Sequence, residues 1–376
     1  MRAWFPYALL VAGLLILLAA LASGLARFGW AVPVPDPGLL FRHGALMVGG
    51  VLGTLVALER ALALGSRWAL PAPLLCALGG LGMLALPGSL WPPVLITLGS
   101  TALVSVYALG MQREPGAATA AGGLGALLWL TGNALWVAQW PLFVVTLWWL
   151  AFLLLNLTAA PLQESLESGL GPLVAYLAAT GLLVLGLLLD TAGFVAQWRV
   201  SPSALPLFLG QRPIGLALLS TALWMGWWYR PGPLLRQGGA ARFGAVCLLS
   251  GYAWLAASGL VALLTGQLTT GPYRDVALHA FFTGFVAAAV FGGAPRLRAL
   301  LLGRPAASHP ILYLALAALQ LGMVLRIAGD LAGVQSTQQW GGGLSAAAVL
   351  LGVAGAAWGS RRAVSAAAGQ TRPAVG

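Results

Sequence analysis

Apolar runs of roughly 20 residues recur along the whole chain, and short proline- and glycine-rich sequences separate them. A helix needs about 20 apolar residues to cross the roughly 30 Å hydrocarbon layer of a membrane. Separators such as VPVPDPG, REPG and RPGP are typical of turns. The pattern predicts an all-α, polytopic transmembrane helical bundle of about 12 spans, at residues 6–27, 39–63, 69–87, 91–111, 117–138, 141–160, 171–190, 205–229, 241–264, 274–295, 309–330 and 341–359.

Composition supports a chain that lies mainly in lipid. Sixty per cent of the 376 residues are hydrophobic and 7% are charged, whereas soluble proteins carry about 25% charged residues. A membrane β-barrel would need alternating segments of about ten residues, which the sequence lacks. The first run is long for a signal peptide and is interpreted as a retained span. We expect a single transmembrane domain over 1–360 and a short, disordered cytoplasmic tail over 361–376.

The basic residues indicate an orientation. All 19 are arginines, and they stand singly or in pairs at the span ends. With the amino terminus inside, thirteen fall on the inner side and five on the outer side, and Arg326 lies within a span. The positive-inside rule then predicts a multi-pass protein of the bacterial cytoplasmic (inner) membrane with both termini cytoplasmic. The same distribution explains the net charge of +11 without a nucleic-acid partner.

Two histidines are the strongest site candidates. His43 and His279 begin spans that run in the same direction, so both are expected about one turn below the outer surface. Imidazoles at matched depth on two helices suit axial ligation of haem b. Arg42 and Arg326 are expected in the same layer, where a planar guanidinium could bind a haem propionate. Alternatively, each histidine is an interfacial residue and Arg42 extends to the membrane surface.

Further polar residues are expected at the same depth. Asp330 stands four residues after Arg326, so the two could bind an anion together or neutralise each other. Asn133 and Asp190 lie near the outer ends of their spans. Each polar group inside hydrocarbon is a site hypothesis because its burial costs energy.

Copper is a second possible metal. Met47 stands one turn from His43, and a thioether with an imidazole suits Cu(I), although methionine at this spacing is also a common core residue. The two cysteines, Cys76 and Cys247, are isolated in apolar runs and are interpreted as small buried residues. Glycines of the second span allow either close helix packing or a flat macrocycle beside the backbone; these are Gly44, Gly49, Gly50 and Gly53.

Residues 251–330 contain GYAWLAASGLVALLTG, then DVALHAFFTGFVAAAVFGGAPRLRALLLGR, then LALAALQLGMVLRIAGD. This stretch resembles the carboxy-terminal part of the NnrS family, with its Ala-Leu-His-Ala-led helix and its Leu-Arg-Val helix. FRHGALMVGGVLGTL, at 41–55, resembles that family's His-x-His-Glu-led second helix, with Phe41 near the position of the first histidine and no Glu beside His43. The resemblance implies a haem- and copper-containing membrane protein of nitric oxide and nitrosative stress metabolism, with His43 and His279 as ligands.

Three functions follow from these observations. The first is an NnrS-like protein that binds one haem b and either captures a diatomic gas or exchanges electrons with a donor. The second is a cofactor-free transporter or channel for a small anionic solute, for which a broken helix near the midplane would be typical. The only such interruption is Arg212-Pro213, in the weakest of the predicted spans. The third is a structural scaffold whose polar cluster has no ligand.

Overall fold

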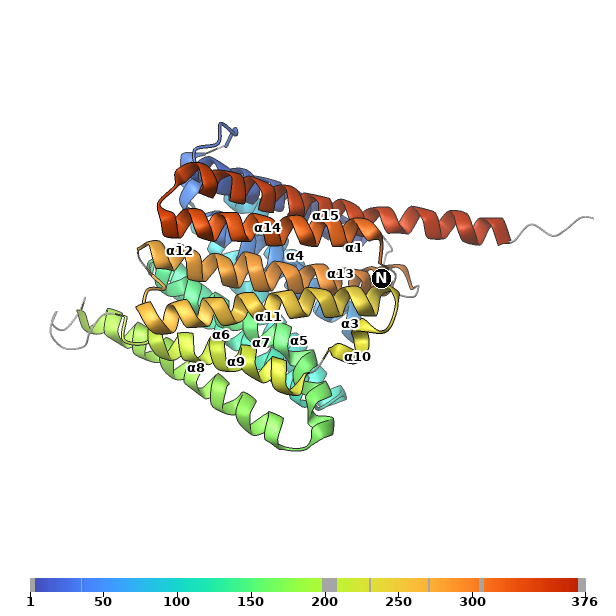
Figure 1. Cartoon of the computed structure of the whole chain (residues 1–376), viewed down its shortest axis with the longest axis horizontal. Helices are drawn as coiled ribbons and strands as arrows, with labels where there is room; N and C mark the ends of the chain where they lie inside the picture. The colour runs from blue at the N-terminus through green and yellow to red at the C-terminus, as the bar shows by residue number, and fades with distance from the viewer. Residues whose placement is uncertain are drawn as a thin grey trace, which may run out of the picture.

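Long α-helices that run side by side along one axis form the protein (Figure 1). The computed structural model describes residues 4–34, 36–197, 208–229, 231–269, 271–303 and 308–370, and no strand occurs among them. Within these ranges, 11 helices are long and apolar enough to cross a membrane. The prediction of an all-α polytopic bundle is therefore confirmed. The eleven segments are Phe5–Arg27 (α1), His43–Leu64 (α2, η2 and α3), Arg67–Ala85 (η3 and α4), Trp91–Arg113 (α5), Ala117–Val137 (α6), Leu142–Ser168 (α7 and η4), Gly171–Val195 (α8), Gly239–Thr265 (α11), Tyr273–Leu302 (within α12, η6 and α13), Pro310–Ala332 (α14) and Gln335–Ala357 (within α15).

The predicted eighth span is the exception. Its residues 205–207 lie outside the described residues, and the helix here is α9, Gln211–Trp228, which is not among the eleven. At 1.5 Å per residue its 18 residues extend about 27 Å. It packs between α8 and α11 (Figure 1). The buried Gln211 fixes its start, because its amide donates to Thr269 Oγ1 at 2.9 Å and its carbonyl accepts from the Leu268 backbone.

Two of the crossing segments change from α-helix to π-helix and back. The first consists of α2 (His43–Ala45), η2 (Leu46–Leu52) and α3 (Gly53–Leu64). The second consists of α12 (Pro272–His279), η6 (Ala280–Val286) and α13 (Ala287–Leu302). Both π-helical segments, η2 and η6, have seven residues. Isolated π-helical turns are frequent at functional sites, and here each one follows within a few residues of a candidate histidine.

Glycines allow the helices to approach closely. A Cβ added at Gly50 would lie 3.2 Å from the Cα of Gly80, where η2 crosses α4. One added at Gly341 would overlap the backbone of Arg326, where α15 packs on α14. Small residues at such crossings provide the van der Waals contact that holds membrane helices together.

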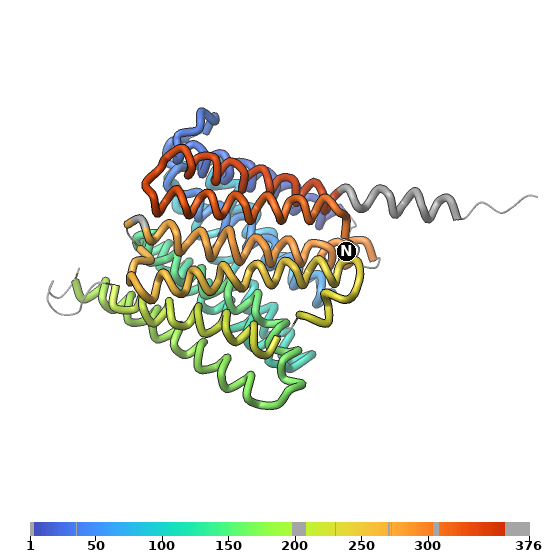
Figure 2. Tube along the Cα trace, viewed as in Figure 1, coloured from blue at the N-terminus to red at the C-terminus, as the bar shows by residue number. Residues whose placement is uncertain are grey.

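The arrangement of the layers places the site. α14 and α15 (Gln335–Gln370) lie on one side of the bundle and α8 and α9 on the other, with α11 and α13 between them (Figure 1). α1 begins at the end of the bundle toward which α15 runs (Figure 2). We call the opposite end the histidine end, because α1 ends there and α2 and α12 begin there. The expected tail is helical as far as Gln370, since α15 continues to that residue, and 371–376 lie outside the described residues.

Candidate functional site

Both candidate histidines lie at the histidine end, and α1 contacts both. His43 is the first residue of α2, and a Cβ added at Gly24 of α1 would lie 4.0 Å from its Cδ2 atom. His279 is the last residue of α12, and its ring centre is 6.4 Å from that of Phe28, one turn further along α1. The end of α1 therefore lies beside both imidazole rings. The structure therefore brings together two side chains that are far apart in the sequence.

The hydrogen bonds of the two rings have the same form. Nδ1 of His279 lies 2.7 Å from the backbone oxygen of Asp275, and Nδ1 of His43 lies 3.4 Å from that of Leu40. A carbonyl oxygen only accepts, so Nδ1 must carry the proton in both bonds. Nε2 of a neutral imidazole then keeps its lone pair. This is the tautomer in which a histidine binds a metal through Nε2 while a backbone carbonyl orients the ring.

A network of two buried and two partly buried charged residues adjoins His279. Arg326 Nε donates to Asp330 Oδ2 at 2.9 Å, and Arg326 Nη2 lies 3.9 Å from Asp275 Oδ2. Arg274 Nη1 donates to the other oxygen of Asp275 at 3.0 Å. The side chains of Arg326 and Asp330 are 3% and 5% exposed. The two residues do neutralise each other, and Asp275 links them to a second arginine.

Arg326 and Arg274 each have one buried nitrogen without a hydrogen-bond partner in the protein. The atoms are Nη1 of Arg326 and Nε of Arg274. Arg27, at the exposed end of α1, adds a positive charge that reaches His43. Three arginines and two aspartates thus leave the network with one net positive charge and free donors. Such a site favours an anionic group.

Phe28 joins the network to the rest of the bundle. The guanidinium carbon of Arg326 lies 3.6 Å from the centre of the Phe28 ring. The backbone oxygen of Phe28 accepts a hydrogen bond of 2.7 Å from Nε2 of Gln339 on α15. The Gln339 backbone in turn accepts from Trp30 Nε1 at 3.1 Å. The start of α15 therefore fixes the end of α1 over Arg326.

Other predicted site residues lie elsewhere. Arg42 lines a separate cavity of about 70 Å³ beside the turn between α4 and α5. Met47 is partly buried and packs against the main hydrophobic core. Asn133 is fully buried and accepts from Trp149 Nε1 at 2.8 Å. Asp190 pairs with Gln211 at 3.4 Å.

The glycines of the second span have different surroundings. Added Cβ atoms at Gly49 and Gly53 would lie 2.9 Å from Ile96 and 2.6 Å from Trp129, so packing explains both. Only Gly44, next to His43, has open space around such an atom. For copper, no group of three or more His, Cys, Asp or Glu side chains that could hold a metal occurs among the described residues.

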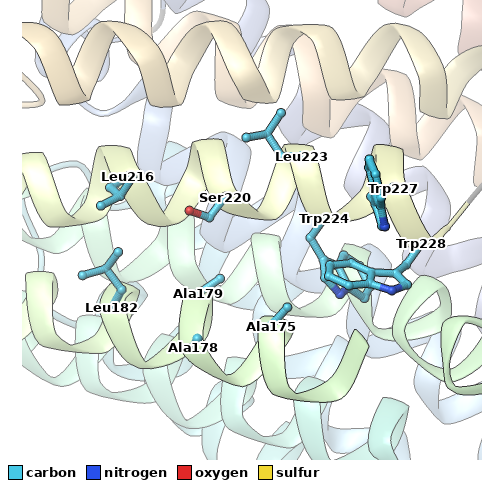
Figure 3. Close-up of a pocket in the computed structure, with 10 residues that line it drawn as sticks. All are labelled: Ala175, Ala178, Ala179, Leu182, Leu216, Ser220, Leu223, Trp224, Trp227 and Trp228. Atoms are coloured by element: carbon cyan, nitrogen blue, oxygen red, sulfur yellow. The ribbon is translucent and has the colours of Figure 1, made fainter. Parts of the chain in front are cut away.

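A larger apolar cavity of about 620 Å³ opens between α8 and α9 (Figure 3). Three alanines of α8 form one wall and three tryptophans of α9 form the other. They are Ala175, Ala178 and Ala179, and Trp224, Trp227 and Trp228. None of the charged residues at the histidine end lines it.

Sequence reasoning did not assign Arg274, Asp275 or Phe28 to the site. For Asp275 a signal was present, because it stands four residues before His279 and therefore lies one turn away on the same helix face. Phe28 offered none, since an aromatic residue at a span end is an ordinary interfacial residue. Its position over Arg326 depends on how α1 packs against α14.

The fold and this site define a polytopic helical membrane protein with a histidine pair and a buried ion network at one end of the bundle. The chain belongs to the family described as Domain of unknown function (DUF8744), which matches residues 6–361. No curated protein and no solved structure matches the chain.

Proposed function

We propose that the protein binds one haem b at the histidine end and exchanges electrons through it. The observation that supports this most directly is the shared state of His43 and His279. Both rings direct Nδ1 to a backbone carbonyl, and Nε2 is left with its lone pair. The two rings lie on different helices at the same end of the bundle, so both could serve as ligands to one haem iron.

The ion network fits the rest of the cofactor. Haem b carries two propionates, and guanidinium groups bind carboxylates well because of their planar fork of donors. Arg326 Nη1 and Arg274 Nε are the donors that have no protein partner. We therefore assign the propionates to these two arginines, with Arg274 in the role that the sequence suggested for Arg42. Gly44 leaves space beside His43.

The residues favour electron transfer over gas capture. When bound, the haem supplies an iron that changes oxidation state by one electron. His43 and His279 would both serve as ligands to the iron, which would leave no ligand position free for a diatomic gas. The Asp275 carbonyl holds His279 firmly at 2.7 Å, whereas the bond of His43 to Leu40 is longer at 3.4 Å. His43 is therefore the less firmly oriented of the two rings. The resemblance to NnrS proteins suggests a role in nitric oxide, nitrosative or redox stress in the bacterial inner membrane.

Visible spectroscopy tests this proposal. The protein is purified in mild detergent from haem-replete cells, and spectra are recorded oxidised and reduced, with iron and copper assays. We expect a Soret band and about one iron per chain, and loss of both in His43→Ala and His279→Ala. His309→Ala is the matched control, because His309 caps the start of α14 at the other end of the bundle and accepts from the Ile311 backbone. We expect the band to persist in that variant.

Two results would contradict the proposal. One is a colourless, iron-free protein from cells that load other cytochromes. The other is an unchanged Soret band in both histidine variants. Size-exclusion profiles of each variant separate loss of cofactor from loss of fold.

A cofactor-free carrier of a small anion is the second candidate, and the unpartnered N–H groups of Arg326 and Arg274 favour it. It predicts saturable uptake of nitrate or nitrite into proteoliposomes by colourless protein. Arg274→Gln should abolish this uptake. Uptake that is equal in empty liposomes would exclude the carrier.

A further inference from the structure

Three buried polar groups in the core of the bundle have no hydrogen-bond partner in the protein. They are Oγ1 of Thr54 on α3, and Nε1 of Trp129 and Nδ2 of Asn133 on α6. Thr54 is 3% exposed, and Trp129 and Asn133 are fully buried. An unsatisfied buried donor or acceptor costs about 1–3 kcal/mol. Gly53, next to Thr54, packs against the Trp129 ring, and Asn133 stands one turn from Trp129 on α6, so one partner could serve all three groups.

The Trp129 ring packs against α3 at Gly53, the residue before Thr54. A Cβ added at Gly53 would lie 2.6 Å from both Cζ2 and Cη2 of the Trp129 ring. These atoms belong to the edge of the indole that also carries Nε1. The N–H group therefore lies on the side of the ring that faces α3, where Thr54 is the next residue along the chain. Phe152 covers one face of the ring at a centroid distance of 4.5 Å.

Thr54 differs from other threonines of this bundle. Seven threonines within the helices donate to the backbone oxygen four residues earlier, at 2.6–3.0 Å: Thr97, Thr101, Thr131, Thr146, Thr158, Thr221 and Thr265. Thr54 makes no such bond, and it stands directly after the π-helical segment η2 and Gly53. Its hydroxyl is therefore available to another group.

Asn133 completes the set. It stands four residues after Trp129, so both side chains lie on the same face of α6. Trp149 Nε1 donates a hydrogen bond to Oδ1 of Asn133, and Nδ2 of Asn133 remains as an unpaired donor. The three groups thus offer two N–H donors and one hydroxyl. A water molecule accepts two hydrogen bonds and donates two, and it needs two to four polar partners when buried. No charged side chain belongs to this set, so an ion is a poorer match.

We propose that a water molecule bridges Thr54, Trp129 and Asn133 within the membrane core. It accepts from Nε1 of Trp129 and Nδ2 of Asn133 and donates to Oγ1 of Thr54. Further polar groups continue along α6 toward the end of the bundle where the chain starts. Gly125, one turn before Trp129, packs against Asn156, whose Oδ1 accepts from Tyr107 at 2.5 Å. The proposed water site does not depend on the proposed haem.

Indole NMR tests the site in the full-length protein in lipid nanodiscs, with ¹⁵N-labelled tryptophan. Trp129→Phe identifies the signal of interest. We expect a cross-peak between the Trp129 indole proton and water, and exchange in D₂O at least tenfold faster than that of Trp149. Trp149 is the internal reference because its Nε1–H is bonded to Asn133. A Trp129 proton without a water cross-peak and as protected as that of Trp149 would overturn the proposal.

Thr54→Val removes the hydroxyl with little change of shape, and it should eliminate the cross-peak or slow the exchange severalfold. Thr221→Val is the matched control, since Thr221 is equally buried but bonds the backbone of Ala217 at 2.8 Å. Thr54→Ser should preserve the cross-peak. If Thr54→Val does not fold, the exchange rates of the Trp129 and Trp149 indole protons in the unchanged protein still test the proposed water.

Discussion

The guanidinium carbon of Arg326 lies 3.6 Å from the centre of the Phe28 ring, so a side chain of α14 stacks on the residue that follows α1. The Arg326 side chain is only 3% exposed, Phe28 is partly buried, and Arg326 is also paired with Asp330 and Asp275. Cation–π attraction is strongest where the cation has lost its water. We therefore expect this contact to contribute to stability, because it joins the end of α1 to the ion network beside the histidines.

Replacing the Phe28 ring tests how much this contact contributes to the free energy of unfolding. Phe28→Leu keeps an apolar side chain but removes the aromatic face, and we expect a loss of about 1–2 kcal/mol in unfolding free energy. Thermal unfolding in detergent measures it. Phe41→Leu is the control, because Phe41 is 74% exposed and its replacement should change stability by less than about 0.5 kcal/mol. Equal effects in the two variants would mean that the stack contributes nothing.

The pair of Arg326 and Asp330 should behave as a buried ion pair. Arg326→Leu leaves a nearly buried carboxylate alone, and we expect a destabilisation of about 3–5 kcal/mol. Arg326→Leu with Asp330→Leu should recover most of this loss, since both charges are then removed. Unfolding midpoints of the two single variants and the double variant give the coupling. Additive losses would show that the two residues act independently.

The same change at the exposed pair supplies the control. Glu59 and Arg60 lie 3.6 Å apart with side chains that are 30% and 28% exposed. Exposed ion pairs contribute about 0–1 kcal/mol, so Arg60→Leu should change stability far less than Arg326→Leu.

Gly341 should not accept a methyl group. Its Cβ would overlap the backbone of Arg326, which is not free to move because α14 packs on α15 there. We expect Gly341→Ala to cost about 1–3 kcal/mol, as overpacking does elsewhere. Gly13→Ala, at a helix position with nothing within 4 Å, should stabilise by up to about 1 kcal/mol because alanine is the better helix former. Melting curves of both variants check the opposite signs.

Membrane orientation can be read from cysteine labelling, since Cys76 and Cys247 are both buried. Pro87 and Pro115 are exposed at turns on opposite ends of the bundle. If both termini are cytoplasmic, an impermeant maleimide should label Pro87→Cys in intact cells and label Pro115→Cys only after lysis. The reverse pattern would place the histidine end in the cytoplasm.

Much of the fold follows from the sequence because crossing a membrane depends on length and hydropathy alone. The expected ends of α1, α6 and α14 agree with the structure to within a residue or two. The region of α9 was harder to predict, since Arg212-Pro213 and the buried polar Gln211 weaken the apolar signal that identifies a span. Gln211 is tolerated because α8 and the segment after α11 supply its hydrogen-bond partners.

The sequence by itself determined that this chain crosses a membrane many times, and it placed His43 and His279 at one depth, because helical rise converts residue number directly into depth. Only the tertiary structure decided which side chains meet in that layer. It brought Arg274, Asp275 and Phe28 to His279 and Arg326, and it left Arg42 and Asn133 in other surroundings. The physical reason is that depth fixes one coordinate of a side chain, whereas the rotation of each helix and its choice of neighbours depend on packing contacts between residues far apart in the chain.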